Sequence, residues 1–308
     1  MKKRILALLL LSIVLLGLGC ENKNEITVYT SVDQVYSEPV FKAFQDKTNI
    51  KVKAVYDIEA SKTVGLANRL IEERDRPVAD VFWNGEVSQT MRLIDLEIVE
   101  KDSFVEFGGR GRVILYDRTK IDLKDLPKTV EDLGSEKYGK DGIRWAMAYP
   151  MFGTSSTQAA ALYSLWGSEE AYAYYQKLKD NGVVLVDGNS VVKDFVSSGK
   201  VVFGLTDTDD AQEAMNKNTN LDILFLDQET IGALVIPNTV TIVKGSGHQD
   251  QAKAFIDYLQ SQEAQEMMYE SGWLDENISQ INILKIDWLD LYYQLQRSKE
   301  EMTSLFIR

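Results

Sequence analysis

Three aspartates lie within four positions in the stretch GLTDTDDA, residues 204–211. Asp207, Asp209 and Asp210 directly follow an apolar run that predicts a buried strand. Polar side chains at the end of such a strand are well placed to form a functional site. Carboxylates at this spacing could bind a cation, act as nucleophile and acid in phosphoryl transfer, or form one wall of a ligand cleft.

An EF-hand calcium loop is excluded by the residues that follow. Counted from Asp207, such a loop needs glycine at the sixth position and glutamate at the twelfth, but Gln212 and Asn218 stand there. A phosphatase of the haloacid-dehalogenase type would use Asp207 as its nucleophile and Asp209 as its acid or base. Ala211 argues against this alternative, because it stands where that superfamily usually has threonine or valine.

The third interpretation places the stretch in one wall of a ligand cleft. Asp209 and Asp210 would then face the ligand, while Thr206 or Asp207 caps a helix that begins at Asp209. Acidic residues also suit the positive end of a helix when no ligand is present. Helix capping and ligand contact therefore both stay open for this stretch.

The chain is poor in the side chains that most enzymes use. His248, in a turn-like stretch, is the only histidine, and Cys20 is the only cysteine. The chain therefore has almost no residues for nucleophilic catalysis by a Ser–His or Cys–His pair, and a zinc site of histidines and cysteines is excluded. We expect a protein that is not an enzyme and that carries no cofactor.

Residues 1–19 read as an export signal. Lys2, Lys3 and Arg4 precede an apolar run over 5–18, which is too short for a membrane span of roughly 20 residues. The ending GLGC, followed by polar residues, resembles a bacterial lipoprotein signal. That resemblance implies lipidation of the Cys20 thiol. We therefore expect an exported protein, lipid-anchored on the outer face of the cytoplasmic membrane or in the periplasm.

The net charge limits the partners of the exported chain. Removal of the signal takes away three positive charges, so the formal net charge moves from −13 to −16. Such an acidic chain is repelled by nucleic acid and by anionic lipid, and we expect neither as a partner. With one cysteine, no disulfide forms within the chain.

Short β-branched runs alternate with helical patterns along the chain, which predicts an α/β protein with mainly parallel sheets. The β segments predicted at 112–116 and 238–243 are the candidates for two β crossings between two lobes. We assign 20–115 plus 241–308 to lobe 1 and 116–240 to lobe 2. A ligand cleft is expected between the lobes, at the carboxyl ends of their strands.

Six stretches, taken together, resemble the extracellular solute-binding proteins of ABC importers, in the branch of the ferric-ion-binding proteins. The resemblance implies the two-lobed type II fold of periplasmic binding proteins, a small-molecule or metal ligand, delivery to a membrane permease, and a monomer. The leading ligand it implies is ferric iron or a metal–anion complex. The stretches are ITVYTSVD, ADVFWNGE, GRGRVILYD, AYPMFGTSST, DGNSVVKDFVSSGKVVFGLTDTDDA and LVIPNTVTIVKGSGHQDQAKAFIDYL.

The metal side of the family pattern is altered in this chain. The adjacent tyrosines that commonly hold iron are replaced by Thr208-Asp209, and Asp33 stands at the position of the family histidine. Glu86 is offset by one residue from the family glutamate. The resemblance thus implies Asp33, Glu86 and Asp209 as possible metal ligands. The segment between Leu96 and Gly111 is also shorter than the family pattern, which reduces a loop that could contribute to the cleft.

The anion-binding side of the family pattern matches this chain more closely than the metal side does. Gly153, Thr154, Ser155 and Ser156 open one predicted helix, and Asn189 and Ser190 open another. Free N–H groups and hydroxyls at helix starts bind anions, and the same residues can simply cap their helices. An acidic wall opposite an anion-binding wall suits a metal–anion complex, or a small zwitterionic or phosphonate-like solute. Aromatic side chains at strand ends could also line the cleft, although they equally suit the core: Tyr29, Trp83 and Tyr149.

Overall fold

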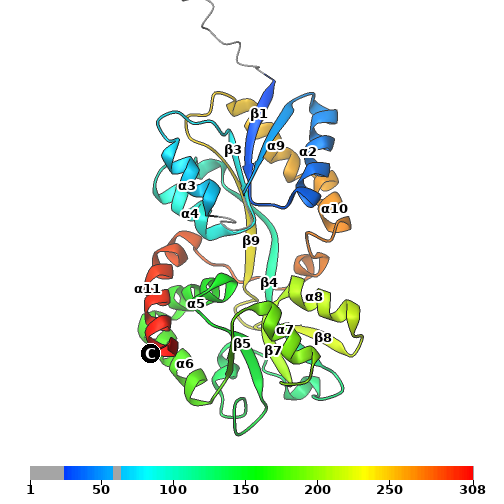
Figure 1. Cartoon of the computed structure of the whole chain (residues 1–308), viewed down its shortest axis with the longest axis vertical. Coiled ribbons are helices and arrows are strands. Elements are labelled where there is room, and N and C mark those ends of the chain that lie inside the picture. Colours follow the sequence, from blue (N-terminus) through cyan, green and yellow to red (C-terminus); the bar gives the residue numbers. More distant parts are fainter. Residues whose placement is uncertain (1–23, 58–63, 308) are drawn as a thin grey trace, which may run out of the picture.

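The computed structural model describes residues 24–57 and 64–307, which form two lobes joined at a narrow waist (Figure 1). The predicted signal and Cys20 lie outside the described residues. Within those residues, no helix is long and apolar enough to cross a membrane. The described residues form a nine-stranded sheet: eight strands follow the order β2-β1-β3-β9-β4-β7-β5-β6, and β8 pairs with β4 off this path.

Lobe 1 is built on parallel strands. β1 (Glu25–Thr30) pairs in parallel with β2 (Lys51–Tyr56) and with β3 (Val81–Asn84), as the alternating strand and helix patterns predict. Helices α2 (Gln34–Thr48), α3 (Gly65–Glu72) and α4 (Val87–Asp95) follow these strands in turn. This order brings the carboxyl ends of β1 and β3 together, and the Gly85 backbone N–H donates to the Ser31 hydroxyl at 2.9 Å.

Two antiparallel strands cross between the lobes, as predicted. β4 (Val105–Asp117) pairs with β9 (Val235–Ile242) through its first half and with β7 and β8 through its second half. The register between β4 and β9 shifts between Phe107 and Arg110, where two consecutive glycines have positive φ. Figure 1 shows both strands running through the waist.

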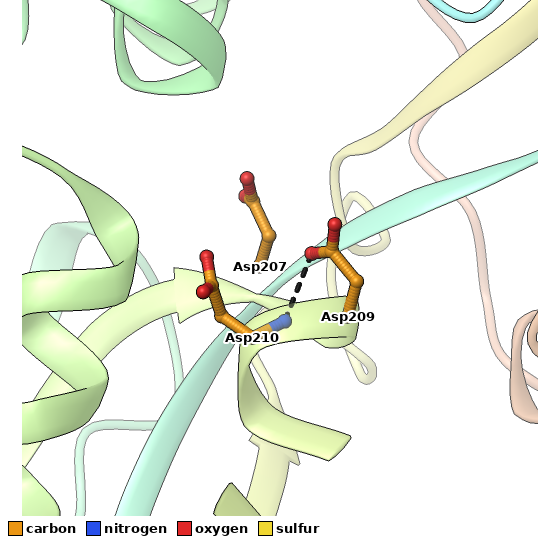
Figure 2. Close-up of side chains that lie close together, drawn as sticks. All are labelled: Asp207, Asp209 and Asp210. Carbon is orange, nitrogen blue, oxygen red and sulfur yellow. Dashed lines mark hydrogen bonds between the residues drawn. The ribbon is translucent and has the colours of Figure 1, made fainter. Parts of the chain in front are cut away.

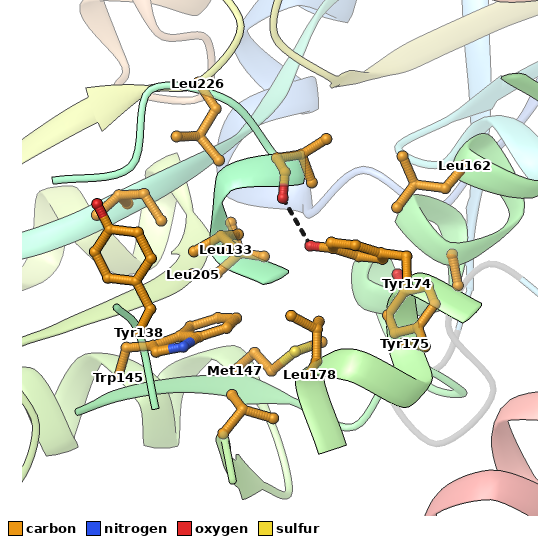
Figure 3. Packing of buried hydrophobic residues seen from close by; sticks show 14 of the residues in the cluster. Leu133, Tyr138, Trp145, Met147, Leu162, Tyr174, Tyr175, Leu178, Leu205 and Leu226 are labelled. Carbon is orange, nitrogen blue, oxygen red and sulfur yellow. Dashed lines mark hydrogen bonds between the residues drawn. The ribbon is translucent and has the colours of Figure 1, made fainter. Parts of the chain in front are cut away.

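Lobe 2 is built around the other end of the same sheet. β7 (Phe203–Asp207) pairs antiparallel with β4 and parallel with β5 (Trp145–Ala148), which in turn pairs with β6 (Val184–Val186); β8 (Leu221–Phe225) lies on the other side of β4. One core of this lobe is rich in aromatic and aliphatic side chains (Figure 3). The helices of the lobe are α5 (Gly153–Trp166), α6 (Ser168–Asp180), α7 (Asn189–Ser197) and α8 (Thr208–Lys217), with short 3-10 turns at Leu123–Asp125 and Glu131–Gly134.

The chain ends with helices on both lobes. α9 (Gln249–Leu259) and α10 (Gln262–Glu270) pack in lobe 1, whereas α11 (Trp288–Ile307) packs chiefly against α5 of lobe 2 and also contacts α4 of lobe 1 and α6 of lobe 2 (Figure 1). Met302 and Leu305 of α11 are buried in the lobe 2 core. The sequence analysis assigned 241–308 to lobe 1, whereas α11 has contacts with helices of both lobes. The remaining short turns are Lys101–Ser103 and Glu276–Gln280.

Candidate functional site

A cavity of about 430 Å³ lies where the two lobes and the crossing strands meet. Lobe 1 contributes the segment after β1, with Asp33 and Tyr36, and the aromatic ring of Trp273. β4 contributes Arg110, and lobe 2 contributes Asp209 from the start of α8. The predicted cleft is therefore present, and its walls carry charges of both signs.

Asp207 and Arg112 form an ion pair beside this cavity. They are direct partners in the β4–β7 ladder, and their carboxylate and guanidinium lie 2.5 Å apart. Both side chains are almost wholly buried. The second Asp207 oxygen accepts from the Thr154 hydroxyl at 2.6 Å and from the Asn189 amide at 2.8 Å. Every carboxylate oxygen of Asp207 is therefore bonded within the chain.

The guanidinium of Arg112 also engages the predicted anion-binding residues. It donates to the side chains of Thr154, Ser155 and Asn189 at 3.4, 3.3 and 3.1 Å, and its Nε donates to Gln158 at 2.9 Å. These polar groups were expected to be available to a ligand anion. In the structure they bind Arg112 and Asp207 instead, because the pairing of β4 with β7 brings both charges to the starts of α5 and α7.

The other residues of that wall have different surroundings. Ser156 is buried and its hydroxyl donates to the Gly153 carbonyl at 2.8 Å, inside its own helix. Gly153 and Ser190 are exposed. Asp207 stands at the N-cap position of α8, but its side chain makes no capping hydrogen bond there. The capping role considered for Asp207 is therefore wrong, since its carboxylate turns to Arg112.

The three aspartates nevertheless gather at one point (Figure 2). One oxygen from each of Asp207, Asp209 and Asp210 lies within 4.8 Å of the others, and the Asp210 backbone N–H donates to Asp209 at 3.0 Å. Loss of hydration in the cleft, and then repulsion from Asp207, raise the pKa of Asp209, while Arg110 opposes the shift. Loss of hydration and repulsion from Asp209 and Asp207 raise the pKa of Asp210 to about 6. A proton or a cation relieves this repulsion.

Arg110 and Arg112 are functional candidates that the sequence analysis missed. Arg110 lines the cavity and lies 3.9 Å from the Asp209 carboxylate. The two arginines stand two residues apart in β4 and therefore share one face of the strand. The signal was present in GRGRVILYD, where two arginines directly precede the run VILY.

Comparison with known proteins identifies the family. The family of bacterial extracellular solute-binding proteins matches residues 25–274, which is most of the chain. The chain belongs to this family. As a solute-binding protein it shares the two-lobed architecture that the resemblance implied. The phosphatase alternative gains no support, because the family is different and the Asp207 carboxylate is fully bonded to its neighbours.

Several relatives of this solute-binding protein have names that state a ligand. The major ferric iron-binding protein of Neisseria meningitidis serogroup B is 29% identical over 264 residues, covering 78% of this chain and 77% of the relative. The Fe(3+)-binding periplasmic protein of Serratia marcescens is 27% identical, with 87% and 85% covered. Iron-bound HitA from Pseudomonas aeruginosa superposes with a TM-score of 0.70 at 25% identity, covering 92% and 99%. A more distant relative, 25% identical with 82% and 78% covered, is a putative 2-aminoethylphosphonate-binding periplasmic protein of Salmonella typhimurium.

The three predicted metal ligands of the binding protein do not all reach the cavity. Asp33 and Asp209 line it from opposite lobes. Glu86 is the N-cap of α4, and its carboxylate accepts from the Ser88 backbone N–H at 2.9 Å and from the Ser88 hydroxyl. Gly85, not Glu86, contributes to the cavity wall. The Glu86 side chain therefore stabilises a helix start in this structure.

Two of the three predicted cleft aromatics belong to the core of lobe 1. Tyr29 is fully buried and its hydroxyl donates to Glu73 at 2.9 Å; burial and that bond raise its pKa to about 12. Trp83 is fully buried and makes an edge contact with Trp273, at 5.6 Å between ring centroids. Tyr149 is half-buried against the lobe 2 core. The aromatic residues that do line the cavity are Tyr36, in the first turn of α2, and Trp273, in the turn after α10. They were missed because the sequence analysis looked for cleft aromatics only at strand ends.

Proposed function

We propose that this protein is the solute-binding component of an ABC importer, which captures its cargo outside the membrane and delivers it to the permease. The role is one of binding without catalysis. Lipidation of Cys20 would hold the folded lobes at the membrane surface, and the chain would act as a monomer. Family membership supports the transport role, and the sequence of the export signal supports the anchor.

The cargo that the cleft supports best is a metal–anion complex, with ferric iron as the leading metal. The carrying observation is that each lobe supplies one carboxylate, Asp33 and Asp209, while β4 supplies the positive charge of Arg110 to the same cavity. Closure of the lobes would bring both carboxylates onto one cation. Oxygen donors suit hard cations, and Arg110 suits the anion that accompanies the metal.

The donor set of the cleft explains why a complex fits better than a bare ion. The phenol of Tyr36 is the only further acidic oxygen among the described side chains that line this cavity. Two carboxylates and one phenol leave a hard cation short of ligands, since such ions take about six. The anion of the complex would supply the remaining oxygens.

A small zwitterion is the second candidate, and one observation favours it. Opposite charges on Arg110 and Asp209 lie 3.9 Å apart in the wall, with the ring of Trp273 in the same cavity. An amine could contact the carboxylate and the aromatic face, while an acidic group contacts the guanidinium. The relative named for 2-aminoethylphosphonate is consistent with this chemistry.

Thermal unfolding against a ligand panel tests the proposal. The exported chain, with Cys20→Ala, is heated with Fe³⁺ plus citrate, Fe³⁺ plus bicarbonate, each anion alone, and 2-aminoethylphosphonate. A ligand at a hundredfold excess over its Kd stabilises the folded state by about 2.7 kcal/mol. We expect Fe³⁺ with an anion to raise the melting temperature, and Asp209→Ala and Asp33→Ala to remove the rise. Asp122→Ala, whose side chain is 72% exposed beside Lys124, is the matched control and should retain it.

A rise with 2-aminoethylphosphonate alone would replace iron by the zwitterion as cargo. No rise with any ligand in the panel would contradict both candidates. A rise with Fe³⁺ that Asp209→Ala and Asp33→Ala leave intact would place the metal elsewhere than in this cleft.

A further inference from the structure

Three helices of lobe 2 begin at the same point, beside the cavity. Thr154 lies in the first turn of α5, Asn189 opens α7 and Asp207 is the N-cap of α8, and their side chains are hydrogen-bonded to one another. Helix N-termini carry partial positive charge and unpaired N–H groups. The N-termini of these three helices together therefore favour a negative charge at this point of lobe 2.

A buried arginine adds a full positive charge at that point. The Arg112 side chain is 2% exposed and donates to groups from α5, α7 and β7. A guanidinium so far from water needs a counter-anion, because an unpaired buried charge is strongly destabilising. Arg112 therefore requires a nearby anion, independently of the helix starts.

The chain supplies this anion from Asp207. One carboxylate oxygen accepts from Arg112, and the other accepts from Thr154 and Asn189. The group thus receives a guanidinium and two polar side chains from helix starts, which is the set of donors that a bound carboxylate or phosphate would receive. Its position leaves Arg112 neutralised before any cargo arrives.

We propose that Asp207 is a specificity-determining residue: its carboxylate takes the place of the anion that lobe 2 would otherwise accept from the cargo. This inference rests on the proposed transport function. It assigns different tasks to the two arginines, because Arg112 is satisfied internally while Arg110 remains in the cavity wall. The cargo therefore presents positive charge to Asp209 and Asp210, and carries its own anion toward Arg110.

The charges around the cleft support this assignment. With Asp207 in place, three aspartates face two arginines, so this wall is acidic. Without Asp207, the two signs balance and Arg112 lacks a partner. One oxygen of Asp207 lies within 4.8 Å of one oxygen of Asp209 and one of Asp210, so the charge of Asp207 adds to the attraction of this wall for a cation.

The experiment removes the carboxylate and offers a replacement in solution. Asp207→Ala leaves a space the size of the lost group beside Arg112, and the variant is heated with sodium formate, acetate, phosphate or bicarbonate at one fixed ionic strength, with chloride as reference. We expect at least one of these anions to raise the melting temperature of Asp207→Ala by about 3 °C or more, as a ligand of the folded state does. The wild type should show no rise beyond the chloride reference.

Asp227→Gly is the matched control. Asp227 is also buried, but its carboxylate accepts from the Val130 N–H and the Thr230 hydroxyl and not from an arginine; glycine suits its φ of 61°. The melting temperature of Asp227→Gly should be lower than that of the wild type, and no anion should raise it beyond the chloride reference. Asp207→Ser, which keeps a hydroxyl acceptor for Arg112, is measured in parallel in case Asp207→Ala does not fold, and the soluble yield with formate against chloride is a further readout.

Two results would overturn the proposal: equal stabilisation of wild type and both Asp207 variants by the anions, or no anion-specific recovery of either Asp207 variant. These measurements need no cargo, so they are independent of the proposed ligand. A separate titration with Fe³⁺ plus citrate, with and without added phosphate, tests the link to transport. Wild-type affinity should be unchanged by phosphate, and a failure of iron binding there would count against the cargo and not against the role of Asp207.

Discussion

Arg112 and Asp207 face each other across the β4–β7 ladder, at the end of β7 where the helices of lobe 2 begin. Their charged groups are 2.5 Å apart, with 2% and 4% of the side chains exposed. Strand pairing therefore fixes a buried ion pair at the wall of the cleft. This relationship determines which polar groups of lobe 2 remain available to a ligand.

Removing one charge of the Arg112–Asp207 pair should strongly lower the free energy of unfolding. Arg112→Met leaves the Asp207 carboxylate buried without its guanidinium, and we expect a loss of about 3–5 kcal/mol in the free energy of unfolding. Urea unfolding of Arg112→Met, Asp207→Leu and the double variant gives the coupling energy. The double variant should be more stable than the sum of the single losses implies. Strict additivity would show that the two charges do not depend on each other. Lys253→Met, which breaks an exposed pair with Asp257, should cost less than about 1 kcal/mol.

Asp210 should make stability depend on pH. Its pKa is about 6 in the folded protein, against about 3.9 for an unfolded aspartate. Between these values the folded state holds the proton more tightly, so this group lowers stability as the pH rises through that range. Asp210→Asn should match the wild type near pH 4 and exceed it by about 1 kcal/mol at pH 7, after allowance for partial exposure. Denaturant unfolding at both pH values measures the difference. A difference that is the same at both pH values would contradict the raised pKa.

Gly109 should be irreplaceable in the crossing strand. It has a φ of 128°, and a Cβ there would lie 2.5 Å from the Ile236 carbonyl oxygen of β9. Gly109→Ala combines backbone strain with a collision against backbone, and we expect a loss of about 2–4 kcal/mol in unfolding free energy. Gly167→Ala has positive φ but open space around its Cβ, so its loss should be near 1 kcal/mol. Equal losses for the two variants would show that the contact with β9 is unimportant.

The C-terminal helix should contribute to the stability of lobe 2. Met302 on α11 is fully buried in the core that contains Tyr163 and Tyr175. Met302→Ala leaves a cavity there and should cost about 2–5 kcal/mol in urea unfolding. Ser304→Ala, on the exposed side of the same helix, should change stability by less than about 0.5 kcal/mol. A loss for Met302→Ala as small as for Ser304→Ala would show that α11 is loosely attached.

Some elements were predictable because their signals are local. Alternating β-branched runs and amphipathic helices predicted the α/β lobes, and the β segments predicted at 112–116 and 238–243 overlap the two crossing strands. The position of Asp207 at the end of a buried strand was also predictable from the run that precedes it. The C-terminal helix was predictable as a helix, but its apolar stripe does not say which lobe it covers.

The sequence by itself determined the two-lobed family, the strands that cross between the lobes, and the gathering of three aspartates beside a helix start. The tertiary structure alone decided what those aspartates do. Arg112 and Asp207 are 95 positions apart, and only the antiparallel register of β4 and β7 makes them partners. Each has a charge that must be neutralised once it is buried. Long-range strand pairing, and not any local pattern, therefore pairs Asp207 with Arg112. Asp33, Asp209 and Arg110 line the cleft instead.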